Sequence, residues 1–155
     1  MLGVIYVEAP RDRPENSYDT PSVFLAGGIT GCEDWQAHVR RRMADDRVVL
    51  LNPRRADFDV TRGDSAAQQI AWEWRHLHDP RTTATLFWFA PDAVQPIALF
   101  ELGGALAGRR RIVVGTHPSY PRRLDVVLQA GHFDPDLVVH DDLDDVITAT
   151  REAVR

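Results

Sequence analysis

The chain has 155 residues, of which 44% are hydrophobic and 26% charged, a composition that suits one globular domain. A formal net charge of -5 lacks the basic excess that is typical of proteins that bind polymeric nucleic acid. Its single cysteine, Cys32, excludes an intramolecular disulfide. Neither a basic-then-apolar leader nor an apolar run of about 18 residues occurs. We therefore expect one cytoplasmic domain over residues 1–155 that does not bind membranes.

Short apolar runs alternate with longer amphipathic segments in the first half of the chain. We predict strands over 2–7, 22–26 and 48–51, and helices over 33–45 and 65–77. In the helix over 65–77, the spacing of Ile70, Trp74 and Leu77 predicts that these three side chains face the core.

The same alternation continues in the second half. We predict strands over 84–90, 112–115 and 137–140, and helices over 95–106, 121–130 and from residue 143 onward. Near-continuous apolar strands separated by helices indicate a parallel sheet that is covered on both faces.

The predicted fold is therefore an α/β, flavodoxin-like three-layer sandwich. Its sheet would be mainly parallel and five-stranded, and residues 2–7 would supply one extra N-terminal strand. In such folds ligands bind outside the carboxyl ends of the strands, where the strand order reverses. We expect the functional residues at that edge.

Glu101 lies inside an otherwise apolar helical segment that directly follows the strand over 84–90. Two interpretations remain open. An acid near the start of a helix is stabilised by the helix dipole, by about 0.3 to 1 kcal/mol. Alternatively, the carboxylate is directed into the ligand crevice. The pattern predicts that Phe100 and Leu102 are buried, and that residues 103–104, both glycine, allow a close approach of a neighbouring segment.

Two other segments offer candidate ligand contacts at the same edge. Gly27, Gly28 and Thr30 lie in a turn whose N–H groups could hold a phosphate or a hydroxylated ligand, although a plain strand-to-helix turn explains it equally well. Glu73 stands between two tryptophans, which would raise its pKa by desolvation unless it is an exposed flank. In a helix beginning at Ser65, Glu73 lies about 12 Å from the start. The six histidines lack metal-binding spacing, so we expect no metal and no cofactor.

Five segments in the right order resemble the nucleoside 2-deoxyribosyltransferase-like family. They are Phe24–Gly28, Gln69–Glu73, Leu86–Phe89, Pro96–Gly103 and Val114–Asp125. The most specific of these is Glu-Leu-Gly, beginning at Glu101, after an apolar strand. The chain differs from the family pattern at residue 73, where Glu replaces Asp, and at residues 78–81, which look like an insertion.

This resemblance implies retaining N-glycosyl transfer or hydrolysis on a (deoxy)nucleoside, most simply by a nucleoside 2-deoxyribosyltransferase. Glu101 would be the nucleophile that forms a covalent glycosyl ester, and Glu73 would protonate the leaving base. Asp125 would contact the substrate of a neighbouring subunit, which implies a homodimer or larger homo-oligomer. The alternatives are a nucleoside 5'-monophosphate N-hydrolase and a non-catalytic nucleotide-binding module. Trp35, Trp72 and Phe58 could stack on a base, but core packing is the commoner use of tryptophan.

Overall fold

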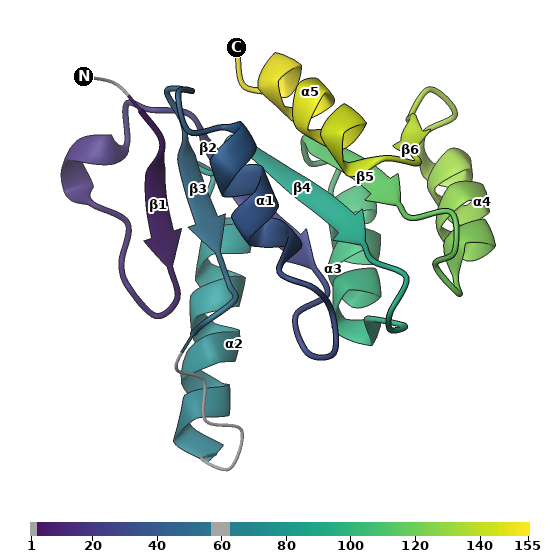
Figure 1. Ribbon diagram of the computed structural model, residues 1–155, viewed down its shortest axis with the longest axis horizontal. Helices are drawn as coiled ribbons and strands as arrows, with labels where there is room; N and C mark the ends of the chain where they lie inside the picture. Colours follow the sequence, from purple (N-terminus) through teal and green to yellow (C-terminus); the bar gives the residue numbers. More distant parts are fainter. Residues whose placement is uncertain (1–2, 57–62) are drawn as a thin grey trace.

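The computed structural model describes residues 3–56 and 63–155, which form a parallel sheet between two layers of helices (Figure 1). The strands are β1 (Ile5–Glu8), β2 (Ser22–Gly27), β3 (Val49–Asn52), β4 (Ala84–Phe89), β5 (Ile112–Thr116) and β6 (Val139–His140). The helices are α1 (Trp35–Arg42), α2 (Gly63–His78), α3 (Pro96–Ala107), α4 (Arg123–Phe133) and α5 (Leu143–Ala153). A short 3₁₀ turn, η1 (Glu15–Ser17), precedes β2.

The strand order confirms the predicted fold. It is β1-β3-β2-β4-β5-β6, and every pair is parallel. Without β1, this is the five-stranded flavodoxin-like order, and β1 is the extra N-terminal strand, paired with β3. Of the strand predicted over residues 2–7, residue 2 lies outside the described residues. The order reverses between β2 and β4, so the ligand crevice of this fold class is expected at the carboxyl ends of these two strands.

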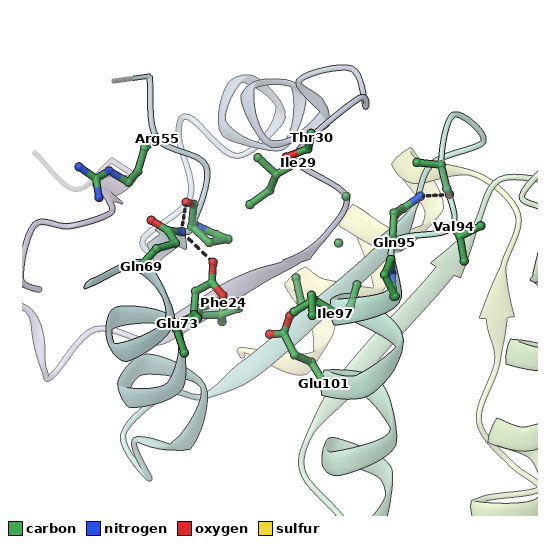
Figure 2. A pocket seen from close by; sticks show the side chains of 18 residues that line it. Phe24, Ile29, Thr30, Arg55, Gln69, Glu73, Val94, Gln95, Ile97 and Glu101 are labelled. Carbon is green, nitrogen blue, oxygen red and sulfur yellow. Dashed lines mark hydrogen bonds between the residues drawn. The ribbon is translucent and has the colours of Figure 1, made fainter. Parts of the chain in front are cut away.

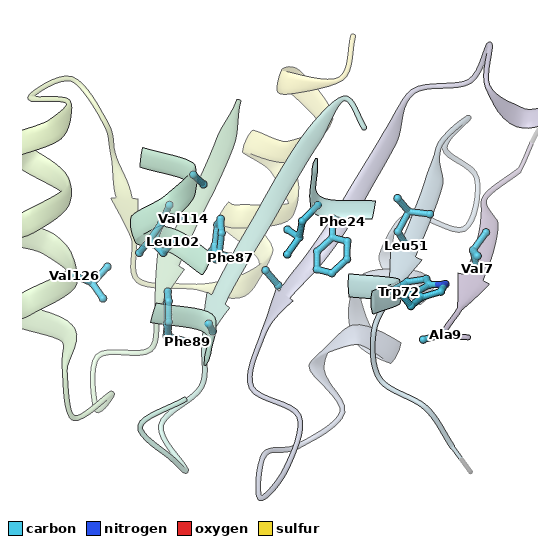
Figure 3. Close-up of a cluster of buried hydrophobic side chains, with 14 of the residues drawn as sticks. Val7, Ala9, Phe24, Leu51, Trp72, Phe87, Phe89, Leu102, Val114 and Val126 are labelled. Atoms are coloured by element: carbon cyan, nitrogen blue, oxygen red, sulfur yellow. The ribbon is translucent and has the colours of Figure 1, made fainter. Parts of the chain in front are cut away.

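Two hydrophobic cores form because successive side chains of a strand point to opposite faces of the sheet. Phe24 and Phe87 join α2, α3 and α4 on one face, which Figure 3 shows. Leu25 and Leu86 join α1 and α5 on the other face. Because both faces are covered, the central strands are mainly apolar on both faces.

The orientation of α2 corrects one prediction. Ile70 and Trp74 were predicted to face the core, but they are 65% and 63% exposed; Leu77, predicted with them, is buried. Trp72 packs against the sheet instead, 6.0 Å from the Phe24 ring and 4.2 Å from the ring of His76. The prediction failed because the face of α2 that meets the sheet carries His76 beside Trp72, and a histidine does not look apolar in the sequence.

Helix α3 also differs from its prediction at one side chain. Leu102 is buried as expected, but Phe100 is 82% exposed. A Cβ atom placed on Gly103 or Gly104 would meet nothing within 4 Å. The close approach that these glycines allow is therefore not used within the described part of a single chain.

Candidate active site

A pocket of about 450 Å³ lies at the carboxyl edge of the sheet, where the strand order reverses. Figure 2 shows it between α2, which carries Glu73, and α3, which carries Glu101. Its wall is mainly apolar and is completed by the loops after β2, β3 and β4. The polar side chains among the lining residues are Thr30, Arg55, Gln69, Glu73, Gln95 and Glu101. A largely apolar cavity of this size with a few convergent polar groups is typical of a small-molecule site.

Glu101 reaches the pocket because of the turn between β4 and α3. Gln95 adopts a left-handed conformation, with φ of 57°, immediately before Pro96 opens the helix. Its side-chain amide donates hydrogen bonds to the carbonyls of Ala90, at 2.6 Å, and Ala93, at 2.9 Å. These bonds fix the turn, and Glu101 follows in the second turn of the helix, directed into the cavity (Figure 2).

Glu73 reaches the same pocket because α2 extends beyond the carboxyl ends of the strands (Figure 1). The helix begins at Gly63, which places Glu73 about 15 Å along its axis. Because the first turns of α2 lie beyond the strands, Glu73 is level with the carboxyl edge of the sheet although it lies well inside the helix. The structure thus brings Glu73 and Glu101 to opposite walls of one cavity.

Burial raises the pKa of both carboxyl groups. Desolvation, followed by the charge of Glu73, raises the pKa of Glu101 to about 8. The pKa of Glu73 is also raised by desolvation, and a hydrogen bond from Gln69 partly opposes that shift. Glu101 Oε2 is buried without a hydrogen-bond partner, and neither carboxylate forms an ion pair with a cation among residues 3–56 and 63–155. Near neutral pH the pair therefore retains a proton.

The turn after β2 lines the pocket with Gly27, Gly28 and Thr30. Packing explains both glycines: a Cβ atom on Gly27 would lie 2.1 Å from the Trp88 carbonyl oxygen, and one on Gly28 would lie 2.8 Å from the Gln95 amide. The absence of a Cβ thus lets this loop seat against β4 and the β4–α3 turn. Contact of these three residues with a substrate stays a prediction.

Asp125 is not brought to the pocket within one chain. It lies on α4 and pairs with Arg122, with 3.0 Å between Oδ2 and Nε. Its role across a subunit interface stays a prediction. The candidates for stacking on a base fare differently: Trp35 and Trp72 are buried core residues, and Phe58 lies outside the described residues.

Sequence reasoning missed Gln69 and Gln95 as site residues. The side-chain amide of Gln69 donates to Glu73 Oε1, at 2.7 Å, and to the Pro53 carbonyl, at 2.6 Å (Figure 2). The four-residue spacing between Gln69 and Glu73 on one helix was a usable signal. The contact with Pro53 was not, because it joins segments that only the fold brings together.

Two features are absent from the described residues. No group of three or more His, Cys, Asp or Glu side chains within residues 3–56 and 63–155 is arranged to hold a metal ion. In the same part of the chain, no helix combines the length and the apolar character needed to cross a membrane.

Comparison with protein families gives a match over most of the chain. A family model described as nucleoside 2-deoxyribosyltransferase like matches residues 20–120. The match includes the turn after β2, both pocket carboxylates and the whole of α3, and it ends before Asp125. No curated protein matches the chain.

Proposed function

The chain belongs to the nucleoside 2-deoxyribosyltransferase-like family, and from this membership and its paired carboxyl groups we propose that it is a retaining N-glycosyl transferase or hydrolase. Its substrate would be a (deoxy)nucleoside, and its simplest activity that of a nucleoside 2-deoxyribosyltransferase. The observation that carries the proposal is the pair Glu73 and Glu101, partly buried on facing walls of one pocket without a cationic partner among the described residues. A fold does not need two such groups there, but a two-carboxylate reaction does.

In the first step, the Glu101 carboxylate attacks the anomeric carbon C1'. The C1'–N bond breaks, its electron pair goes to the base, and Glu73 delivers a proton to that base. The working state of the pair thus carries one proton, on Glu73. The pKa of both carboxyl groups is raised in the pocket, that of Glu101 to about 8. The positive charge that develops at C1' favours the ionised form of Glu101, which the attack requires.

In the second step, a second base or a water molecule attacks C1' and releases the ester. Glu73, now ionised, accepts the proton of that nucleophile, and the original configuration at C1' is restored. The mainly apolar wall favours transfer over hydrolysis, because it reduces the number of water molecules beside the ester.

A second candidate, a nucleoside 5'-monophosphate N-hydrolase, is favoured by Arg55. Arg55 is among the residues that line the pocket, and a guanidinium is a suitable bidentate partner for a phosphate. Comparing a deoxynucleoside with its 5'-monophosphate as substrates separates the two activities. A non-catalytic nucleotide-binding module would turn over neither.

We also propose that the chain works as a homodimer or larger homo-oligomer. Ile97 and Phe100 are exposed on α3, beside the open glycines at 103–104, and the neighbouring α4 exposes Leu124 and Leu128. Burying these side chains against a second copy would remove apolar surface from water. Asp125 on α4 would then be able to contact the substrate of the partner.

Sedimentation analysis tests the assembly. Wild-type protein is expected to be dimeric or larger at micromolar concentration, and Phe100→Glu should weaken association at least tenfold because it places a charge in the apolar contact. Val138→Glu, at an exposed valine outside α3 and α4, is the control and should associate normally. A fully active wild-type monomer would contradict the shared site.

Trapping of the ester tests the proposed chemistry. A 2'-fluoro-arabinosyl nucleoside should leave its sugar on the protein. The fluorine slows breakdown of the glycosyl ester more than its formation, so the adduct accumulates. Intact mass should show one glycosyl adduct, peptide mapping should place it on Glu101, and Glu101→Gln should remain unlabelled. The absence of an adduct, together with no base release from any nucleoside or nucleotide, would refute the enzymatic function.

A further inference from the structure

The hydrogen bonds of Gln69 give this residue a place in the site that the paired carboxylates alone do not explain. Both hydrogens of its amide nitrogen are used, one on the Pro53 carbonyl at 2.6 Å and the other on Glu73 Oε1 at 2.7 Å (Figure 2). Rotating the amide by 180° would place its carbonyl oxygen against two acceptors. The amide orientation is therefore determined by its surroundings.

The carbonyl oxygen of Gln69 is buried and has no hydrogen-bond partner. Leaving a buried acceptor unpaired costs about 1 to 3 kcal/mol, so an apolar side chain of similar size would suit the fold alone better. Gln69 also links the overhanging part of α2 to the loop after β3, since Pro53 follows that strand directly. The cost of the unpaired oxygen is consistent with a residue that is retained for its effect on Glu73.

We propose that Gln69 is a positioning residue that directs the proton of Glu73 toward the leaving base. Glu73 Oε1 accepts the hydrogen bond from Gln69, so a protonated Glu73 must carry its hydrogen on Oε2, the oxygen left for the pocket. When the C1'–N bond breaks, this proton moves from Oε2 to the base nitrogen, and the remaining carboxylate keeps the charge-assisted bond to Gln69. The inference rests on the proposed N-glycosyl chemistry.

The same hydrogen bond also affects the titration of the two carboxyl groups, Glu73 and Glu101. It favours the ionised form of Glu73 and so opposes the rise in its pKa that burial causes. Losing the bond therefore has two consequences: the proton is no longer confined to Oε2, and the pair titrates at higher pH. A residue that only supported the fold would produce neither effect on a correctly folded variant.

The test compares Gln69→Met with the wild-type protein and with Glu152→Met, which places the same methionine at an exposed position of α5. The substrate is the natural deoxynucleoside or nucleotide that the wild type cleaves fastest. Base release by Gln69→Met should fall about 10- to 100-fold, a part of the usual contribution of a general acid, and its pH–rate profile should move to higher pH. Glu152→Met should match the wild type. Should Gln69→Met fail to fold, Gln69→Glu preserves the shape and should also lose rate, increasingly as the pH rises and its new carboxyl ionises.

A second substrate separates proton delivery from general damage to the site. The base of 7-methyl-2'-deoxyguanosine leaves without needing a proton, so its release by Gln69→Met should stay within about threefold of the wild type. Equal losses on both substrates, or an unshifted pH–rate profile, would overturn the role of Gln69 while leaving the glycosyl chemistry intact. A wild-type protein that cleaves no substrate would instead refute the proposed function itself, and the inference with it.

Discussion

The two edges of the sheet differ in how many hydrogen-bond partners the protein provides for a charged side chain. At the amino edge, Arg13 is only 5% exposed, and its guanidinium contacts five acceptors, on Ser17, Ser22, Thr20 and Arg81. At the carboxyl edge, Glu73 and Glu101 are partly buried, and among the described residues their carboxyl groups accept a single hydrogen bond, the one from Gln69 to Glu73.

This difference separates a structural network from a site that is prepared for a ligand. Every donor of Arg13 is satisfied by the protein, so this guanidinium has no hydrogen left for another molecule. The two carboxyl groups have raised pKa values, and one buried oxygen, Glu101 Oε2, has no hydrogen-bond partner. A bound substrate would supply the missing interactions. The apparent insertion at residues 78–81 belongs to the first edge, where Asp79 pairs with Arg81 and the Arg81 carbonyl accepts a hydrogen bond from Arg13.

The largest expected effect comes from removing the nucleophile. Glu101→Gln preserves the shape of the side chain but cannot form the ester, so the rate of base release should fall at least about 1,000-fold, or roughly 4 kcal/mol in barrier. Steady-state kinetics measure the rate, and circular dichroism verifies the fold. Glu152→Gln, an exposed glutamate on α5, should retain full activity. Near-normal turnover by Glu101→Gln would mean that Glu101 only stabilises its helix.

At the opposite edge, Arg13→Met should destabilise the fold without disabling the site. The substitution leaves several buried acceptors unpaired, so the free energy of unfolding should fall by about 2 to 4 kcal/mol. Urea denaturation measures this loss, and activity at a temperature where the variant is folded should stay within about twofold. The exposed Arg41→Met should change stability by less than about 0.5 kcal/mol. A stable but inactive Arg13→Met protein would break the contrast between the two edges.

A smaller effect should appear in the pH dependence of stability. Since the pKa of Glu101 rises on folding from its ordinary 4.5 to about 8, the native state binds this proton more tightly than the unfolded state. That contribution is complete below pH 4.5 and is lost as the pH rises to 8. Glu101→Gln removes it, so the variant should gain stability over the wild type across this window, with a limiting slope of about 1.4 kcal/mol per pH unit.

Denaturation of both proteins at several pH values measures that gain. Glu152→Gln should show a difference from the wild type that hardly changes with pH, since its side chain is exposed. A Glu101→Gln protein that is equally destabilised at every pH would show that the carboxyl group is not held in a desolvated state. The expected signs are thus opposite at the two edges: removing Arg13 weakens the protein, and removing the charge of Glu101 strengthens it at high pH.

Much of this molecule was predictable from local patterns. The apolar runs and their spacing predicted each strand and helix to within a few residues, and parallel pairing followed from strands that are apolar on both faces. Glu101 was predictable as a pocket residue because an acid in an apolar helix directly after a strand falls at the carboxyl edge of such a sheet. The exposure of Phe100 was not, because it depends on which side of α3 meets the sheet.

The sequence by itself determined the order of the elements, the class of fold and the identity of the first carboxylate, because each depends on residues that are close along the chain. Only the tertiary structure decided which face of α2 meets the sheet, how far this helix extends past the strands, and the hydrogen bond from Gln69 to the Pro53 carbonyl. Trp72 sets that rotation by packing on Phe24, which lies in a distant strand. The pairing of Glu73 with Glu101 likewise depends on where two helices lie on one sheet, and no local spacing contains that information.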